Sequence, residues 1–222
     1  RPLVRQGVHI WTDWPLAKYN AANPPIGRDA FEARIIEDGE FAARWGDLGP
    51  VYGYQWRHWP DGSAEGVDQI AALIAGIKTN PASRRHIFTG WNVAQLDAMA
   101  LPPCHMTYQY FVANGRLSGT LYQRSCDLGL GFPFNIFEAA LLIRMIAQQC
   151  DLEPGELVWM GADCHVYLDH AHLVEAQLSR APRAFPTLAL TRRPASILDY
   201  RPEDFVLSGY DPHPHIVAPV SV

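Results

Sequence analysis

The sequence contains no apolar run that approaches the roughly 20 residues needed to cross a bilayer. Its first residues, Arg1-Pro2-Leu3, also lack the cationic, apolar and small-residue zones of a secretory signal. Positive charge is scarce, because 18 Lys and Arg face 23 Asp and Glu and give a formal net charge of -5. Nonspecific nucleic-acid binding needs a basic surface. We therefore expect a soluble, cytoplasmic protein with no membrane anchor and no stable nucleic-acid partner, whose anionic ligands are held by a local arginine cluster.

Cysteine is also sparse, and its spacing excludes a disulfide scaffold. The four cysteines are widely separated and form no Cys-x-x-Cys pair: Cys104, Cys126, Cys150 and Cys164. A chain of 222 residues that is 48% hydrophobic can bury one sizeable core without cross-links. The nearest approach to a metal site is Asp163-Cys164-His165 with two later histidines. It lacks the tight ligand pairs of a zinc site, so we expect no metal.

The chain is expected to form a single domain over residues 1–222, with an insertion at residues 12–45. The insertion contains Asn-Pro-Pro-Ile-Gly at 23–27, followed by a helical pattern over residues 29–45. We interpret it as a small helical cap on the surface. The glycine-rich loop that follows, residues 46–56, presents Tyr52, and apolar spacing then predicts a helix over residues 66–79 that ends before Pro81.

A short strand is expected at residues 86–91. Further along, an Asn-Gly dipeptide at residues 114–115 separates two runs of alternating polarity. Asn-Gly between such runs is the strongest short signal for a hairpin. The first run covers residues 105–113 and the second returns over residues 116–123. Cys104 therefore lies at the start of one strand and Arg124 at the end of its partner. The hairpin is expected to bring thiol and guanidinium together although they are 20 residues apart.

The rest of the pattern indicates an α+β fold. Residues 135–150 are the most hydrophobic helix, apolar over most of its circumference, as expected for a central buried helix. A strand at 155–165, an amphipathic helix at 170–179 and short strands near 188–190 and 205–207 follow. Helices and antiparallel strands are mixed without a βαβ rhythm, which favours α+β over α/β.

Taken together and in order, these motifs resemble the folate-dependent thymidylate synthase family. The matching stretches are Ile10-Trp11-x-x-Trp14, Gly46-Asp-Leu-Gly-Pro-Val-Tyr-Gly-x-Gln-Trp, Ser83-Arg84-Arg85, Pro103-Cys104-His105, Gln123-Arg124-Ser125-Cys126-Asp127, Phe134-Asn135, Asp163-x-His165-x-Tyr167, Tyr210-Asp-Pro-His213-Pro and Ala218-Pro-Val-Ser-Val222. The resemblance covers essentially the whole chain, insertion included. It implies the thymidylate synthase fold, a mixed and mainly antiparallel sheet with a central buried helix, dimerising through the sheet.

The resemblance implies methylation of dUMP at C5 to give dTMP, with 5,10-methylenetetrahydrofolate as one-carbon donor and reductant and without a metal. Cys104 would add to C6 of the pyrimidine as a thiolate. Most cysteines are small buried hydrophobic residues, and taken alone Cys104 would be one of them. Arg124 across the hairpin instead favours the role of nucleophile for Cys104. The family pattern adds four residues to the catalytic network: Tyr52, His105, Gln123 and Asp163.

Arginines are implied for the 5′-phosphate of the nucleotide. Arg124 and Ser125 would hold it within one subunit, beside Cys126, and Arg84 and Arg85 would reach it from the second subunit. Guanidinium groups bind phosphate oxygens in pairs, which lysine cannot do. Taken alone, Arg84-Arg85 would be a solvated pair after a helix. Under the resemblance the active site is shared, so the protein is expected to be a homodimer.

Asn135 is the implied reader of the base. Its amide can donate to O4 and accept from N3–H of uracil, whereas cytosine reverses both groups and relatives acting on cytosine nucleotides resemble this site with Asp there. Asn135 also suits the N-cap of the helix that follows, and both roles are compatible. His165 and Tyr167, two apart on a strand, point the same way and would bind the sugar 3′-hydroxyl.

The folate slot is the last implied site. Asp127, next to the nucleotide residues, would hydrogen-bond the pterin, and the C-terminal tail would close over the rings. The residues implied for folate are Ile10, Trp11, Trp14, Leu101, Asp127, Gly131, Phe134 and Val220.

Two departures from the family pattern leave alternatives open. The family continues N-terminally with an arginine and a catalytic glutamate, so a native segment is expected to precede Arg1. Residues 136–139 are Ile-Phe-Glu-Ala where members usually have Ile-Ala-Ser-Tyr. A buried Glu138 is costly without a partner, which makes it either paired or functional. One alternative is a uridylate hydroxymethylase, in which water attacks the exocyclic methylene carbon in place of the hydride. Trp11 should shield that carbon and so favours methylation. The other is a non-catalytic nucleotide-binding homologue.

Overall fold

A computed structural model describes residues 2–220. Arg1 and the last two residues of the C-terminal motif, Ser221 and Val222, lie outside that range. The described chain forms two compact units, residues 2–55 with 90–103 and residues 56–89 with 104–220. Each unit is described by itself. None of the helices within residues 2–220 combines the length and the apolar character that a membrane span requires.

The first unit is helical. It contains α1 (Pro2–Arg5), α2 (Asp13–Ala22), α3 (Arg28–Glu37), α4 (Gly39–Trp45) and the 3-10 helix η1 (Val93–Ala98). A small aromatic core holds the insertion together, in which the rings of Tyr19 and Trp45 meet edge to face at 5.2 Å. The single helix expected over residues 29–45 is wrong. The chain breaks at Asp38, whose carboxylate accepts the Phe41 N–H at 2.9 Å and caps a separate helix.

The second unit begins at residue 56, within α5 (Gly53–Arg57), and continues with α6 (Gln69–Thr79). Asp68 caps α6 by accepting the Ala71 N–H at 2.9 Å, and the helix begins at Gln69, three residues after the expected start. The helix ends at Thr79 with Asn80 as its C-cap, and Pro81 prevents its continuation. Its apolar positions at 70, 73 and 77 are buried, as their spacing predicts.

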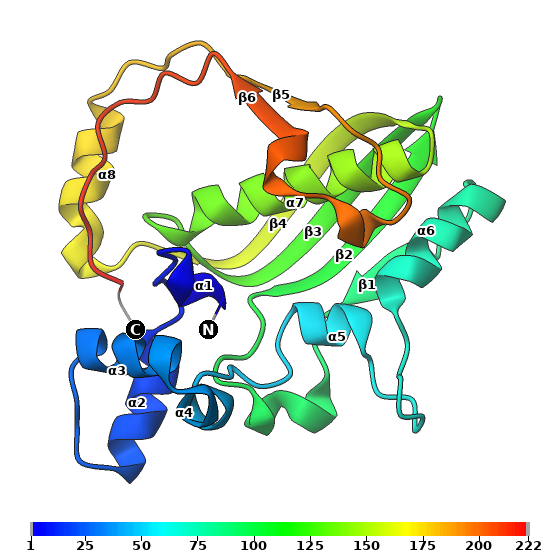
Figure 1. Cartoon of the computed structure of the whole chain (residues 1–222). Coiled ribbons are helices and arrows are strands. Elements are labelled where there is room, and N and C mark those ends of the chain that lie inside the picture. Colours follow the sequence, from blue (N-terminus) through cyan, green and yellow to red (C-terminus); the bar gives the residue numbers. More distant parts are fainter. Residues whose placement is uncertain (1, 221–222) are drawn as a thin grey trace. The chain divides into compact units, whose positions relative to one another are not determined.

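The second unit is built on a sheet with strand order β1-β2-β3-β4. The strands are β1 (Ile87–Thr89), β2 (His105–Ala113), β3 (Arg116–Asp127) and β4 (Glu153–His165). The first two pairings are antiparallel and the third is parallel. Helix α7 (Gly131–Gln149) joins β3 to β4 and lies along one face of the sheet (Figure 1). The expected absence of a βαβ unit is therefore wrong, while the α+β class with a mainly antiparallel sheet is confirmed.

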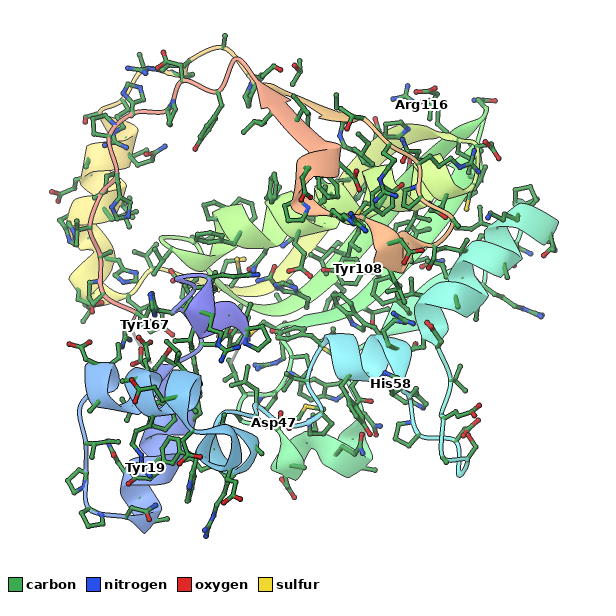
Figure 2. The ribbon with its side chains drawn as sticks, in the orientation of Figure 1. Tyr19, Asp47, His58, Tyr108, Arg116 and Tyr167 are labelled. Atoms are coloured by element: carbon green, nitrogen blue, oxygen red, sulfur yellow. The ribbon has the colours of Figure 1, made fainter. Side chains whose placement is uncertain are left out.

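The predicted hairpin is confirmed with its register. Asn114 and Gly115 both have positive φ, at 51° and 72°, which is the geometry of the tight turn that Asn-Gly favours. Ala113 pairs with Arg116 beside the turn. Figure 2 shows Arg116 at this end of the sheet and Tyr167 at the opposite end. The turn therefore lies at one end of the hairpin, and Cys104 and Arg124 lie at the other, open end.

The core of the second unit lies between α6, the sheet and α7. A Cβ at Gly119 would lie 3.1 Å from Ile143 and from Tyr110, so glycine there permits the close approach of α7 to the sheet. The buried side chains are Ile70, Leu73, Ile77, Phe88, Tyr108, Tyr110, Leu117, Leu121, Ala139, Ile143, Ile146 and Ala147. Each of the larger ones contributes about 2 to 5 kcal/mol to stability when compared with alanine.

Helix α7 begins at Gly131, four residues earlier than expected, and Leu130 occupies its N-cap position. The N-cap role considered for Asn135 is therefore wrong. Asn135 lies one turn inside the helix, where its side chain is available to neighbours on the sheet. The earlier start follows from Asp127, whose Oδ1 accepts the N–H groups of Gly129 at 2.9 Å and Leu130 at 3.2 Å and turns the chain into the helix.

The remaining elements follow β4 in the order η2 (Leu168–His170), α8 (Ala171–Leu178), β5 (Thr187–Leu190), η3 (Ile197–Asp199), η4 (Pro202–Asp204) and β6 (Phe205–Ser208). β5 and β6 form the two short strands expected near the C-terminus and pair with each other. The tail after β6 runs back beside α8 (Figure 1). His172 Nε2 donates to the Val217 carbonyl at 2.9 Å and fastens the tail to that helix.

Candidate functional site

Cys104 and Arg124 are neighbours across the hairpin, as the register predicts. The Arg124 N–H donates to the Cys104 carbonyl at 3.0 Å, and Nη2 of Arg124 lies 3.9 Å from Sγ of Cys104. A guanidinium beside a sulfur favours the thiolate, which is the nucleophilic form. Cys126 differs, because burial raises the pKa of its thiol to about 11 and keeps it neutral. Of these two cysteines, only Cys104 has the surroundings of a nucleophile.

A chain of hydrogen bonds crosses from β4 through β3 to α7. Nε1 of Trp159 donates to Oε1 of Gln123 at 2.9 Å. Nε2 of Gln123 donates to the Ser125 carbonyl at 2.9 Å and to Oδ1 of Asn135 at 2.7 Å. Gln123 is fully buried, so these bonds replace the water that its amide loses. The chain fixes which end of the Asn135 amide is the donor.

His105 lies at the centre of a second group of polar side chains. Its Nδ1 is 3.4 Å from the hydroxyl of Tyr108 and 3.7 Å from Oε2 of Glu138. Burial lowers the pKa of His105 to about 4, and a hydrogen bond with the Asn135 side chain partly opposes this shift. Burial also raises the pKa of Glu138 to about 7. At neutral pH the imidazole is therefore uncharged and the carboxyl is close to its midpoint.

Asp127 and the C-terminal tail meet at His170, one of the two later histidines that the sequence placed beside the rejected metal cluster and to which it gave no other role. Nδ1 of His170 lies 3.6 Å from Oδ1 of Asp127, and Nε2 donates to the Pro219 carbonyl at 2.7 Å. His170 is fully buried, so it is a fixed link between the start of α7 and the residue that precedes Val220. Sequence spacing could not reveal this contact, because 49 residues separate the two partners.

Asp163, His165 and Tyr167 come together at the end of β4. Nδ1 of His165 lies 3.2 Å from Oδ1 of Asp163, and its ring meets that of Tyr167 edge to face at 5.1 Å. The expectation that His165 and Tyr167 share a strand is wrong, since β4 ends at His165. The chain turns there, and the two rings are adjacent through this turn rather than through strand alternation.

Arg84 and Arg85 are exposed on the segment that leads into β1. Gly131 is the first residue of α7 and Phe134 follows in its first turn, where 60% of the Phe134 surface is exposed. Exposed phenylalanine at the start of a buried helix leaves a flat apolar surface for a ligand. Val220 is partly buried in the tail.

The first unit holds its own group of the predicted residues. The ring of Trp11 lies 5.5 Å from that of Trp14 and 5.9 Å from that of Tyr52. Tyr52 has a positive φ of 33°, an uncommon backbone conformation for a side-chain-bearing residue. Ile10 is exposed and Leu101 is partly buried. The unit thus gathers the aromatic side chains expected at the folate slot.

Among residues 2–220, no group of three or more His, Cys, Asp or Glu side chains is arranged to hold a metal ion. The polar groups around Cys104 instead form hydrogen-bond donors and acceptors at fixed places. They can bind a planar heterocycle at the Asn135 amide and an anion at the arginines. The Cys104 thiol lies beside one of these arginines, Arg124.

Comparison with known proteins identifies relatives along the whole chain. The family model described as thymidylate synthase matches residues 1–222. A thymidylate synthase of Rhizorhabdus wittichii is 68% identical, in an alignment that covers 100% of this chain and 76% of that protein. A thymidylate synthase of Sphingopyxis alaskensis is 61% identical over 100% of this chain and 75% of its own length. A thymidylate synthase of Zymomonas mobilis is 57% identical, in an alignment that covers 100% of this chain and 76% of that protein. The chain therefore belongs to the thymidylate synthase family.

Proposed function

We propose that Cys104 is the nucleophile with which this chain methylates dUMP at C5 to give dTMP. The reaction is that of the family to which the chain belongs over its whole length. The observation that supports Cys104 is the Arg124 guanidinium 3.9 Å from its sulfur. This cation favours the thiolate needed for addition to an unreactive pyrimidine.

The covalent step activates the base. The Cys104 thiolate forms a bond to C6, and the C5–C6 double-bond electrons move to C5 and O4 as an enolate. C5 then forms a bond to the methylene carbon of the folate as the bond from that carbon to N10 breaks. C5 loses its proton as the remaining bond from that carbon to N5 breaks, and a hydride from the folate reduces the exocyclic methylene to methyl while the C6–sulfur bond breaks and restores the ring. 5,10-Methylenetetrahydrofolate, as co-substrate, supplies the carbon and a hydride and leaves as dihydrofolate. His105, Gln123, Tyr52 and Asp163 belong to the polar network that handles the C5 proton.

Asn135 reads the base. Its Oδ1 accepts from Gln123, and the amide is fixed with a remaining acceptor site and a donor N–H toward the ligand. Uracil offers an N3–H donor beside the O4 acceptor, which matches this amide. His165 and Tyr167, with adjacent rings at the end of β4, would bind the sugar 3′-hydroxyl.

The phosphate site is proposed to combine two subunits. Arg124 and Ser125 supply one half, with the buried Cys126 beneath them. Exposed Arg84 and Arg85 supply the other from a second copy. The sheet supports such pairing, because the face opposite α7 carries exposed apolar side chains: Ile87, Phe111, Tyr122, Val158 and Met160. An apolar face of this kind is typical of a protein interface.

The folate is proposed to bind against flat apolar rings and one carboxylate. We assign the rings to Trp11, Trp14 and Phe134, and the other folate contacts to Ile10, Leu101, Gly131 and Val220. Asp127, held by two backbone N–H groups, is oriented to accept from the pterin. These residue types fit a planar, donor-rich heterocycle.

Methylation is favoured over both alternatives, because relatives up to 68% identical carry the name thymidylate synthase. The test is incubation with dUMP and methylenetetrahydrofolate, followed by mass analysis of the nucleotide. We expect dTMP with dihydrofolate. Hydroxymethyl-dUMP with tetrahydrofolate would identify the hydroxymethylase instead, and the absence of any product would favour a binding protein. Cys104→Ala should abolish the product, whereas Cys150→Ala, at the end of α7, should retain it.

A further inference from the structure

Tyr52 lies in a tight turn whose backbone conformation is unfavourable for a residue with a side chain. The Tyr54 N–H donates to the Val51 carbonyl at 2.9 Å, which places Tyr52 at the second position of the turn. Its φ of 33° is positive, and residues that carry a Cβ seldom adopt such values. A conformation of this kind persists only when the surrounding structure enforces it. The residues that enforce it therefore also set the position of the Tyr52 ring.

The side chain of Gln55 closes this turn. It is fully buried, and its Nε2 donates to the Pro50 carbonyl at 2.8 Å. Pro50 precedes Tyr52 by two residues and Gln55 follows it by three, so this bond joins the chain on both sides of the turn. The preceding Gly49 lies against the end of η1, because a Cβ there would be 2.1 Å from the Ala98 carbonyl oxygen. The turn is therefore held both by its own side chain and by a neighbouring helix.

A network of amides fixes the direction of the Gln55 side chain. The Ala94 N–H in η1 donates to Oδ1 of Asn92 at 3.2 Å, so Nδ2 of Asn92 faces Gln55 and donates to its Oε1 at 3.1 Å. The NH₂ group of Gln55 is then directed to the Pro50 carbonyl and to Oε1 of Gln95, which accepts at 2.6 Å. A carbonyl oxygen only accepts, so a rotated Gln55 amide would bring acceptors together. The network therefore admits one orientation of this amide.

We infer that Gln55 is a positioning residue for Tyr52, and that its amide holds the strained turn, and with it the Tyr52 ring, in the place that the reaction requires. This inference rests on the proposed role of Tyr52 in handling the C5 proton. A misplacement of about 1 Å in a reacting group can cost roughly 100-fold in rate. Loss of the Gln55 amide should therefore slow the proton step without removing any group that takes part in it.

The first test reads the backbone of Tyr52 by NMR in protein labelled with ¹³C-tyrosine. The Tyr52 Cα signal is assigned by its loss in Tyr52→Phe, and its chemical shift depends on the backbone dihedral angles. We expect Gln55→Met, which keeps the length of the side chain but removes its amide, to shift or broaden this signal. Gln149→Met is the matched control, because Gln149 is also buried and donates to a proline carbonyl, that of Pro194, at 3.0 Å. An unchanged Tyr52 signal in Gln55→Met, or an equal change in Gln149→Met, would overturn the inference.

The second test follows the C5 proton with dUMP that carries deuterium at C5. Proton removal limits the rate more strongly when the group that handles it is misplaced, so the deuterium isotope effect on kcat should be larger in Gln55→Met than in the unmutated protein. We expect kcat to fall roughly 10-fold to 100-fold with a smaller change in KM. Combination with Tyr52→Phe should add little further loss, because both changes act on the same group. An unchanged isotope effect in Gln55→Met, or losses that multiply in the double variant, would contradict the inference.

Gln95→Met is a milder variant for the case in which Gln55→Met does not fold. Gln95 is partly exposed, and its replacement leaves the bond between Gln55 and Pro50 in place. The Tyr52 signal should change in the same direction as in Gln55→Met but by less, and no change in either variant would overturn the inference. Absence of dTMP formation by the unmutated protein would refute the proposed function, while the NMR comparison would still decide whether Gln55 holds Tyr52.

Discussion

Gln123 donates from Nε2 to Oδ1 of Asn135 at 2.7 Å, and this bond fixes the orientation of the amide proposed to read the base. The orientation follows from Trp159, because an indole nitrogen is only a donor and must face Oε1 of Gln123. Gln123 therefore turns its NH₂ group to Asn135, and Asn135 must accept this hydrogen bond through Oδ1. An amide that could rotate freely would bind uracil and cytosine edges equally, so the proposed base selection depends on Trp159, on the strand β4 that pairs with β3.

Asn135→Asp should change base selection. A carboxylate at this place still accepts from Gln123 but no longer donates to O4 of uracil, and it can accept from the amino group of cytosine. We expect kcat/KM for dUMP to fall by at least roughly 100-fold, because a site that loses a hydrogen bond to its substrate discriminates strongly. Binding of dCMP should improve, as measured by calorimetry. Asn114→Asp in the hairpin turn is the matched control, and equal loss in both variants would contradict a base-reading role.

Arg124→Gln should make Cys104 less reactive. Glutamine retains hydrogen-bonding capacity but removes the charge that favours the thiolate. We expect alkylation of Cys104 by iodoacetamide at pH 7 to slow several-fold, about three to ten times. Peptide mass spectrometry separates Cys104 from the exposed Cys164. Arg116→Gln, at the turn end of the same hairpin, should leave the rate unchanged, whereas equal slowing in both variants would refute a local effect.

The open face of the sheet should be the dimer interface. Val158 on β4 and Val206 on β6 have similar exposure, 48% and 43%, and only Val158 lies on that face. Val158→Glu places a charge in the proposed contact and should shift the protein to monomers at micromolar concentration in sedimentation velocity. Val206→Glu should remain dimeric. A dimer that persists in Val158→Glu at nanomolar concentration would place the contact elsewhere.

Short sequence patterns were sufficient to predict those parts of the fold that depend on neighbouring residues alone. The Asn-Gly turn predicted the hairpin and the juxtaposition of Cys104 with Arg124, and Pro81 predicted the end of α6. The start of α7 was missed because a side chain outside the helix, that of Asp127, begins it. The break at Asp38 was missed because the apolar spacing continues through it.

The polar network could be predicted only in part. Gln123, His105 and Asn135 follow from the resemblance to a family, and Glu138 was noticed as a carboxyl in an apolar helix. Trp159 was not singled out, and His170 was noted only beside a rejected metal cluster. Their partners lie 36 and 49 residues away, and no local pattern connects them. Tertiary pairing determines these contacts, and periodicity does not encode it.

Glu138 and His105 should give stability opposite dependences on pH. Burial raises the pKa of Glu138 to about 7, so its stabilising contribution is present below about 4.5 and is lost as the pH rises to 7. Burial lowers the pKa of His105 to about 4, so its contribution is lost as the pH falls from 6.5 to 4. Glu138→Gln removes the first effect alone. Since Glu138 is partly exposed, solvent screening limits the gain relative to the unmutated protein to about 1 kcal/mol at pH 8, measured by urea unfolding. Glu175→Gln is the control, and an equal gain at pH 5 would contradict the assignment.

Tyr110→Phe should stabilise the protein, whereas Tyr108→Phe should not. Both rings are buried on the same face of β2, two residues apart. The Tyr108 hydroxyl lies 3.4 Å from His105, while the Tyr110 hydroxyl is buried without a hydrogen-bond partner among residues 2–220. A buried hydroxyl with no partner costs about 1 to 3 kcal/mol, so its removal should raise the free energy of unfolding by about 1 kcal/mol. Loss of a bonded hydroxyl in Tyr108→Phe should lower it by a similar amount. If Tyr110→Phe were destabilised as strongly as Tyr108→Phe, the Tyr110 hydroxyl would have to be bonded in solution. Glu138, whose charge adds to the burial that raises the pKa of Tyr110, would then be an acceptor to examine.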